Sequence, residues 1–175
     1  MNTKSFNNNF MEKIMEDEAW KKLSSDFPWT ERMLEKYRNK VDWEEVSNNY
    51  NMLWTPSMLD KFKWKINWHQ LSSRSSEALM ITENIERFKD YWDWKELSGN
   101  DSLAWSEQLI ERFIDYWDWE RLLNNYRLDN KILNNKFFEK YQDRIPASKL
   151  QNSNLWDNMV EEEKQKIIAR IVSEG

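Results

Sequence analysis

The tetrapeptide Tyr-Trp-Asp-Trp occurs twice in this chain, at 91–94 and at 116–119, 25 residues apart. Weaker copies of the segment that joins them extend through most of the sequence. A period of about 20–50 residues is typical of stacked repeat arrays, in which a unit buries its apolar face only against its neighbours. This repeat constrains the fold more than any other feature of the sequence.

The repeats align on the tryptophan that follows the aspartate. The aligned positions are 23, 25, 26, 25 and 28 residues apart, as expected for fixed helices joined by loops of changing length. They are Trp20, Trp43, Trp68, Trp94, Trp119 and, in the last copy, Ala147.

Each repeat predicts a short helix that opens at the aligned tryptophan. The preceding residue is an N-cap candidate, whose side chain can accept a hydrogen bond from a free backbone N–H. These candidates are Asp42, Asn67, Asp93 and Asp118. Glu45, Gln70 and Glu96 follow at the spacing of a capping box. Small polar residues then end the helix, and we expect Asn and Gly to adopt the left-handed conformation there.

A second helix of about three turns follows, with apolar residues recurring at i, i+1, i+4 and i+8 along one stripe. Its N-cap candidates are Thr30, Thr55, Thr82, Ser106, Asn134 and Asp157. The sequence therefore predicts an all-α fold, a short α-solenoid of stacked helical hairpins with repeats of about 25 residues.

The ends of the chain differ from the repeats. Residues 1–19 are predicted to hold a polar leader (1–9) and a capping helix (10–18), residues 20–156 the repeats, and residues 157–175 a C-terminal capping helix. Apolar residues predict the buried side of that last helix, which covers the final repeat. They are Met159, Val160, Ile167, Ile168, Ile171 and Val172.

Twelve tryptophans are unusual in a chain of 175 residues. Two short helices leave little room for many aliphatic side chains, and each large aromatic buries about 150–250 Å². We expect the tryptophans to stack into an aromatic spine in the core. The alternative is an aromatic groove for glycans, nucleotides or proline-rich peptides. Trp64 is the exception, because the aligned residues in other repeats are polar, and we expect its side chain to be exposed, as an interface anchor or as cover for an edge of the core.

Charges repeat as well. Acidic residues form one column (Glu35, Asp60, Glu86, Glu111 and Glu139), and basic residues form the next (Lys36, Lys61, Arg87, Arg112 and Lys140). The columns predict a solvated ladder of salt bridges, with a partner-reading surface as the alternative.

Catalysis is not expected. His69 is the only histidine, at an aligned position that varies, and the chain has no cysteine and only two glycines. Neither a nucleophile with its base, nor a metal site, nor a phosphate-binding loop can be assembled from these residues. We expect no cofactor.

The composition also bounds the partners. The net charge of −5 and the lack of a basic stretch argue against nucleic-acid binding. The N-terminus has no apolar signal region and no segment has about 18 consecutive apolar residues, so we expect a cytoplasmic protein that does not span a membrane.

The segment 94–119 reads W-x-x-L-S-x-N-x-x-L-x-W-S-E-x-L-I-E-R-F-x-D-Y-W-D-W. It resembles the Trp-rich tandem helical repeats of bacterial and phage-type proteins. The resemblance covers about residues 20–156 and is weaker where Met80 and Ala147 replace tryptophans. It implies a repeat scaffold and supplies no activity or functional residue.

Our first hypothesis is a non-enzymatic module that binds a protein or peptide on one solenoid face. The candidate partner-binding residues are Trp64, His69, Arg74, Lys95 and Arg127, taken as variable, exposed positions. The alternative is a protein that sequesters or senses a small ligand, a nucleotide or a glycan, with aromatic side chains. A weaker third idea is an inhibitor that presents its acidic columns to a basic partner. We also expect that end repeats could pair two molecules.

Overall fold

The structure is a computed structural model and describes residues 8–174. The predicted leader falls mainly on residues 1–7, which lie outside the described residues. The described part of the chain is helical with no strand, as the sequence predicted. It divides into two compact units, residues 1–71 and 72–175, and in each the repeats stack in the manner of a helical-repeat solenoid.

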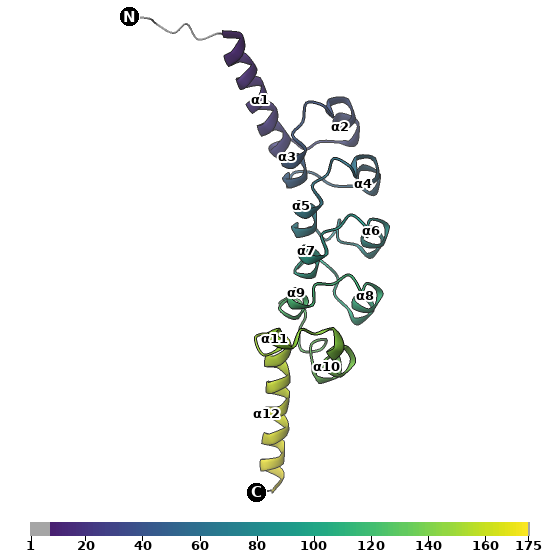
Figure 1. The fold of residues 1–175 in the computed structure, drawn as a ribbon, viewed down its shortest axis with the longest axis vertical. Coiled ribbons are helices and arrows are strands. Elements are labelled where there is room, and N and C mark those ends of the chain that lie inside the picture. The colour runs from purple at the N-terminus through teal and green to yellow at the C-terminus, as the bar shows by residue number, and fades with distance from the viewer. Residues whose placement is uncertain (1–7, 175) are drawn as a thin grey trace, which may run out of the picture. The chain divides into compact units, whose positions relative to one another are not determined.

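The first unit holds the first two repeats and the start of the third. Here α1 packs against α3, while α2 and α4 form the second row of helices (Figure 1). The helices are α1 (Asn8–Asp26), α2 (Glu31–Tyr37), α3 (Trp43–Asn48), α4 (Pro56–Phe62) and the start of α5 (Trp68–Ser73).

The second unit holds the remaining repeats and the C-terminal helix. Here α7 packs against α9, and α8 and α10 lie in the outer row (Figure 1). Its helices are α6 (Thr82–Arg87), α7 (Trp94–Ser98), α8 (Glu107–Arg112), α9 (Trp119–Leu123), α10 (Asn135–Tyr141), the 3₁₀-helix η1 (Gln142–Arg144), α11 (Ala147–Leu150) and α12 (Asn154–Glu174).

The predicted caps set where the helices begin. Each Asp or Asn before an aligned tryptophan accepts a hydrogen bond from the first turn of its helix, as Asp93 does from the N–H groups of Lys95 and Glu96. Thr30, Thr55, Ser106 and Asn134 cap the second helices in the same way. Thr82 is instead the first residue of α6 and gives no side-chain cap.

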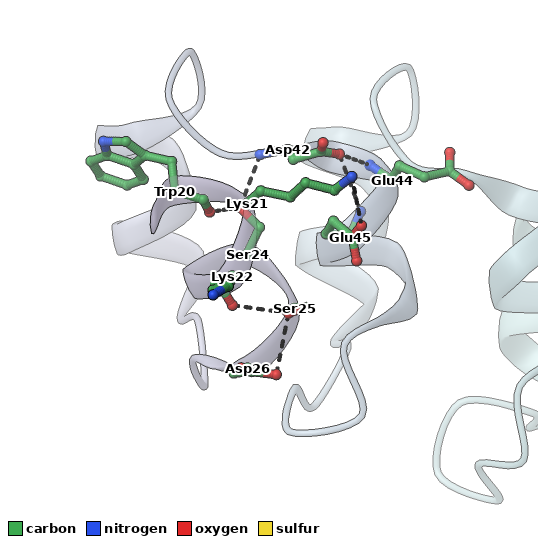
Figure 2. A network of polar contacts seen from close by, with 9 residues as sticks. All are labelled: Trp20, Lys21, Lys22, Ser24, Ser25, Asp26, Asp42, Glu44 and Glu45. Atoms are coloured by element: carbon green, nitrogen blue, oxygen red, sulfur yellow. Dashed lines mark hydrogen bonds and ion pairs between the residues drawn. The ribbon is translucent and has the colours of Figure 1, made fainter. Parts of the chain in front are cut away.

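The capping-box prediction was wrong, because a serine of the preceding repeat takes the place of the Glu or Gln. The backbone N–H of Asp42 donates to Ser24 Oγ at 2.9 Å, while Glu45 pairs with Lys21 (Figure 2). Three further junctions have the same bond at 2.9 Å: Asn67 to Ser47, Asp93 to Ser72, and Asp118 to Ser98. We call Ser24, Ser47, Ser72 and Ser98 the junction serines, and all four are buried.

The ends of the short helices are built differently from the prediction. Among the described residues no backbone φ is positive, so the left-handed ends are absent. A buried asparagine ties the helix end to the preceding repeat instead. The Nδ2 group of Asn125 donates to the carbonyl oxygens of Ser98 and Asn100, and Asn49 and Asn100 make equivalent pairs of bonds.

The core contains most of the aromatic residues, as expected. All 12 tryptophans lie in the described range, and only Trp64 is exposed. The ring of Trp94 lies 5.2 Å from that of Phe113 and 5.0 Å from that of Trp117. Its indole N–H donates to the carbonyl oxygen of Lys89 at 2.8 Å, so the ring also fixes the preceding turn.

The two end helices depart from the sequence prediction. The capping helix expected at 10–18 continues into the first repeat as α1, because Ala19 stands where other repeats have a capping Asp or Asn. At the other end, α12 begins at Asn154, capped by Ser153 Oγ rather than by Asp157. Its predicted buried side was also wrong: Met159 is half-buried, and the other five residues are exposed.

Candidate protein-interaction surface

Trp64 lies in the turn that follows α4. The backbone N–H groups of Lys65 and Ile66 both donate to the carbonyl oxygen of Phe62, which closes a tight turn. Phe62 and Ile66 are buried, whereas Trp64, at the middle of the three residues between them, has a side chain that is 80% exposed. The expectation of an exposed tryptophan is confirmed. An exposed aromatic of this size is a candidate interface anchor.

A shallow hollow of about 220 Å³ lies beside this tryptophan, within the first unit. Aromatic rings provide its apolar part, because Trp43 and Phe62 pack with centroids 5.0 Å apart. Basic side chains provide most of its polar part. We call the lining residues the Trp64 surface: Glu35, Arg38, Trp43, Lys61, Phe62, Trp64 and Lys65.

Cations outnumber carboxylates among the side chains that line this hollow: Arg38, Lys61 and Lys65 against Glu35. Lys61 Nζ lies 2.8 Å from Glu31 and 3.1 Å from Glu35, and these hydrogen bonds raise the pKa of Lys61. The same bond from Lys61 lowers the pKa of Glu31. Within the described residues no carboxylate forms an ion pair with Arg38 or Lys65. The surface therefore combines an apolar patch with cationic groups available to an acidic partner.

Arg74 was predicted to be exposed, and this was wrong, because its side chain is only 6% exposed. Arg74 lies six residues after the aligned Trp68, which is the position of the buried Asn49, Asn100 and Asn125 in their repeats. Its backbone carbonyl accepts a hydrogen bond from Asn100 Nδ2 at 3.0 Å. Arg74 therefore belongs to the column that joins repeats.

The other candidates, His69, Lys95 and Arg127, are exposed, and none of them is among the residues that line the hollow at Trp64. His69 lies in the first turn of α5. In the second unit, Lys95 lines a hollow with Asp118 and Glu120, whereas Arg127 lines a different one with Met80 and Leu103.

Arg127 has a structural partner within its own unit. Its Nε group donates to the carbonyl oxygen of Asp101 at 2.9 Å. The hydroxyl groups of Tyr126 and Ser75 donate to the Asp101 carboxylate, and these bonds, Tyr126 first, lower the pKa of Asp101. This cluster links neighbouring loops and holds Arg127 in place.

The charge columns form the ladder that the sequence predicted. Lys61 pairs with Glu35, Arg112 with Glu86, and Lys140 with Glu111, each cation reaching the acid of the preceding repeat. Asp115, the residue aligned with Trp64, pairs with Arg144. Trp64 therefore stands where at least one other repeat has an acid that forms an ion pair with the next repeat.

Comparisons with known proteins supply no function for this surface. No protein-family model, no curated protein and no solved structure matches the chain. Among the described residues, no cluster of His, Cys, Asp or Glu is arranged to hold a metal ion. No helix in residues 8–174 is both long enough and apolar enough to cross a membrane.

The sequence reasoning missed the cations around Trp64. The signal was present as the alternation Lys61-Phe62-Lys63-Trp64-Lys65, which is basic and aromatic within an acidic chain. The turn that follows α4 then places the two aromatic side chains differently, with Phe62 buried and Trp64 exposed beside Lys65.

Proposed function

We propose that this chain is a non-enzymatic protein-interaction module that binds an acidic peptide segment of a partner at the Trp64 surface. The observation that carries the proposal is the 80% exposed Trp64 beside a hollow whose lining includes the rings of Trp43 and Phe62. Burying a tryptophan of this kind at the centre of an interface typically contributes more to binding than the surrounding contacts do.

The charged side chains around the hollow indicate that the partner segment is acidic. Arg38 and Lys65 line the hollow and form no ion pair with a carboxylate of the described residues, whereas Lys61 is paired with Glu31 and Glu35. Complementary charge speeds encounter and selects the partner, whereas like charge at this rim would oppose binding. A partner segment with an apolar side chain flanked by Asp or Glu fits both parts of the surface.

The test uses fluorescein-labelled peptides with a central Leu or Trp and with acidic, neutral or basic flanks. Fluorescence anisotropy with the full chain should show binding of the acidic peptides, with affinity falling as salt rises. Trp64→Ala should weaken this binding about 30-fold, the size of an interface hot spot. Lys65→Glu should weaken it with the acidic peptides in particular.

The matched control is Leu53→Ala. Leu53 is 81% exposed and lies in the same unit, but it does not line the hollow. Its substitution should leave peptide affinity unchanged, and circular dichroism should show wild-type helix content for all variants. Equal binding of acidic and basic peptides, or unchanged affinity in Trp64→Ala, would contradict the proposal.

The small-ligand alternative has less support from the geometry. Eleven of the twelve tryptophans are buried or half-buried, so their rings are used in packing. The hollow at Trp64, about 220 Å³, is also smaller than the roughly 300–1,000 Å³ of a typical ligand pocket, and three larger hollows of about 390, 470 and 520 Å³ have no aromatic side chain in their lining. Titration of nucleotides and glycans against tryptophan fluorescence distinguishes the two, since only a ligand pocket would quench on such additions.

A further inference from the structure

Past Met159, α12 meets the repeats through polar side chains: Asn135 Nδ2 donates to Glu162 Oε2 at 2.6 Å, and Glu161, Glu162 and Gln165 line a hollow beside the start of α10. Leu155 is buried and Met159 is half-buried against the repeats, but every residue from 160 to 174 is exposed. Figure 1 shows that α12 continues beyond α10 and α11 toward its C-terminal end. Isolated helices of fewer than about 12–15 residues are marginal in water, because tertiary packing of an apolar face normally stabilises them.

The exposed segment 160–174 has an apolar face suited to another helix. Val160, Ile167 and Ile171 follow one another at spacings of seven and four, the pattern of a coiled-coil seam. Ile168 and Val172 widen the stripe on one side, and all five side chains are exposed. Lys164 occupies the remaining seam position, where its methylene groups can lie on the apolar stripe with the amine in water.

The charges on the same segment are separated along its length. Glu161, Glu162 and Glu163 lie toward its N-terminal end, whereas Lys164, Lys166 and Arg170 lie toward its C-terminal end, with Glu174 as the single acid there. A parallel copy would bring like charges together. An antiparallel copy places the acidic end of each helix opposite the basic end of the other, which selects the antiparallel orientation.

We propose that the exposed segment of α12 binds the same segment of a second copy of this chain, as an antiparallel two-helix coiled coil. The seam spacing places Val160 opposite Ile171 of the second copy, and Glu163 opposite Arg170. The contact is isologous, so it closes at a dimer and leaves no free seam. The proposal does not depend on peptide binding at Trp64, because the two sets of residues lie in different units.

The expected dimer is weak. A helix pair of about four turns buries less than the roughly 1,200 Å² at which standard interfaces begin. We therefore expect a dissociation constant in the range of about 1–100 µM. Sedimentation equilibrium of the full chain across that range should show conversion from monomer to dimer.

The first set of variants locates the face. Ile167→Glu places a charge in the seam and should weaken association at least about tenfold, while the retained repeats keep most of the helical circular dichroism. The matched control is Phe10→Glu, an equivalent change on the exposed apolar face of α1. If Phe10→Glu abolished association, the contact would run from α1 to α12 and the proposal would be overturned.

The second set tests the orientation. Glu163→Arg and Arg170→Glu should each weaken the dimer about threefold to tenfold, since each creates like-charge contacts across the pair. The double variant restores opposite charges at both symmetry-related contacts, and association should return to near the wild-type level. A double variant weaker than both single variants, or a wild-type chain that stays monomeric up to about 300 µM, would overturn the proposal.

Discussion

The hydroxyl group of Ser98 joins two consecutive repeats through Asp118. Its oxygen accepts a hydrogen bond from the backbone N–H of Asp118 at 2.9 Å, and its hydrogen is donated to the carbonyl oxygen of Trp94 at 2.6 Å. Ser98 is fully buried. One small side chain therefore satisfies a helix end and the start of the next short helix, and the same bond recurs at four junctions.

At the last junction, between the repeats that begin at Trp119 and Ala147, both members of this hydrogen bond are replaced. Leu123 stands at the junction-serine position and is fully buried, and the next cap position holds Pro146. Proline has no backbone N–H, so this junction has no donor that needs a hydroxyl acceptor. Losing both partners of a buried hydrogen bond is far less costly than losing one.

Ser98→Ala should therefore destabilise the chain by about 1–3 kcal/mol, the cost of leaving the buried N–H of Asp118 without an acceptor. Urea unfolding followed by circular dichroism measures the change. Ser173→Ala removes a hydroxyl that bonds only within an exposed helix turn, and it should stay within about 0.5 kcal/mol of wild type. Equal effects of the two substitutions would show that the junction bond contributes nothing specific.

The last junction provides the reverse experiment. Pro146→Asp alone adds an N–H that faces Leu123, whereas Leu123→Ser alone removes a buried leucine side chain. Together they rebuild the pair seen at Ser98 and Asp118. We expect the double variant to be more stable than the sum of the single effects predicts, by about 0.5–3 kcal/mol. Strict additivity in urea unfolding would argue against the pairing rule.

The adjacent residues Asn124 and Asn125 test how much the buried asparagine bonds contribute to stability. Its Nδ2 group makes two buried bonds, to Ser98 and Asn100, whereas the exposed Asn124 makes one, to Glu120. Asn125→Asp replaces a buried donor with a carboxylate that faces carbonyl oxygens, so we expect a loss of about 3 kcal/mol or more at pH 7. Asn124→Asp should change stability little. A comparable loss from both would contradict the buried role assigned to Asn125.

Local chemistry explains why much of this fold was predictable. Asp, Ser and Thr caps act within three residues, and the apolar stripe repeats at helical spacing, so both are visible in the sequence. The junction bonds are not: Ser98 and Asp118 are 20 residues apart, and nothing local shows that the serine replaces a capping box. The end of α1 was missed for a simpler reason, since Ala19 cannot cap a new helix.

The candidate site was predicted only in part. The exposure of Trp64 followed from the polar residues aligned with it. The burial of Arg74 could have been inferred from the same alignment, because Asn49, Asn100 and Asn125 share its position. The exposed face of α12 could not, since isoleucines at helical spacing look the same whether a neighbouring helix covers them or not.

Two tryptophans at equivalent positions should respond differently to loss of the indole N–H. Trp105 Nε1 donates to the carbonyl oxygen of Asn100 at 2.9 Å, whereas Trp54 Nε1 is buried without an acceptor in the described residues. Both substitutions to Phe remove similar apolar volume. We expect Trp105→Phe to cost about 1 kcal/mol more than Trp54→Phe in urea unfolding. A greater loss in Trp54→Phe would contradict this assignment.

The ion pairs between repeats should make the stability of the chain fall at low pH. The hydrogen bond from Lys140 holds the pKa of Glu111 below its ordinary value of 4.5. A carboxylate with a lowered folded-state pKa contributes stability above its unfolded pKa, and that contribution is lost as pH falls through the folded pKa. The melting temperature of wild type should therefore fall as pH drops below about 4.5.

Glu111→Gln should remove its share of this dependence, so its melting temperature should lie below wild type at pH 7 and approach it at about pH 3. The difference should be small and should shrink in high salt, since both partners are exposed. Glu139→Gln, in the same column but without an ion pair among the described residues, is the control. If both variants showed the same convergence at low pH, the effect would come from net charge and not from the pairing of Glu111 with Lys140.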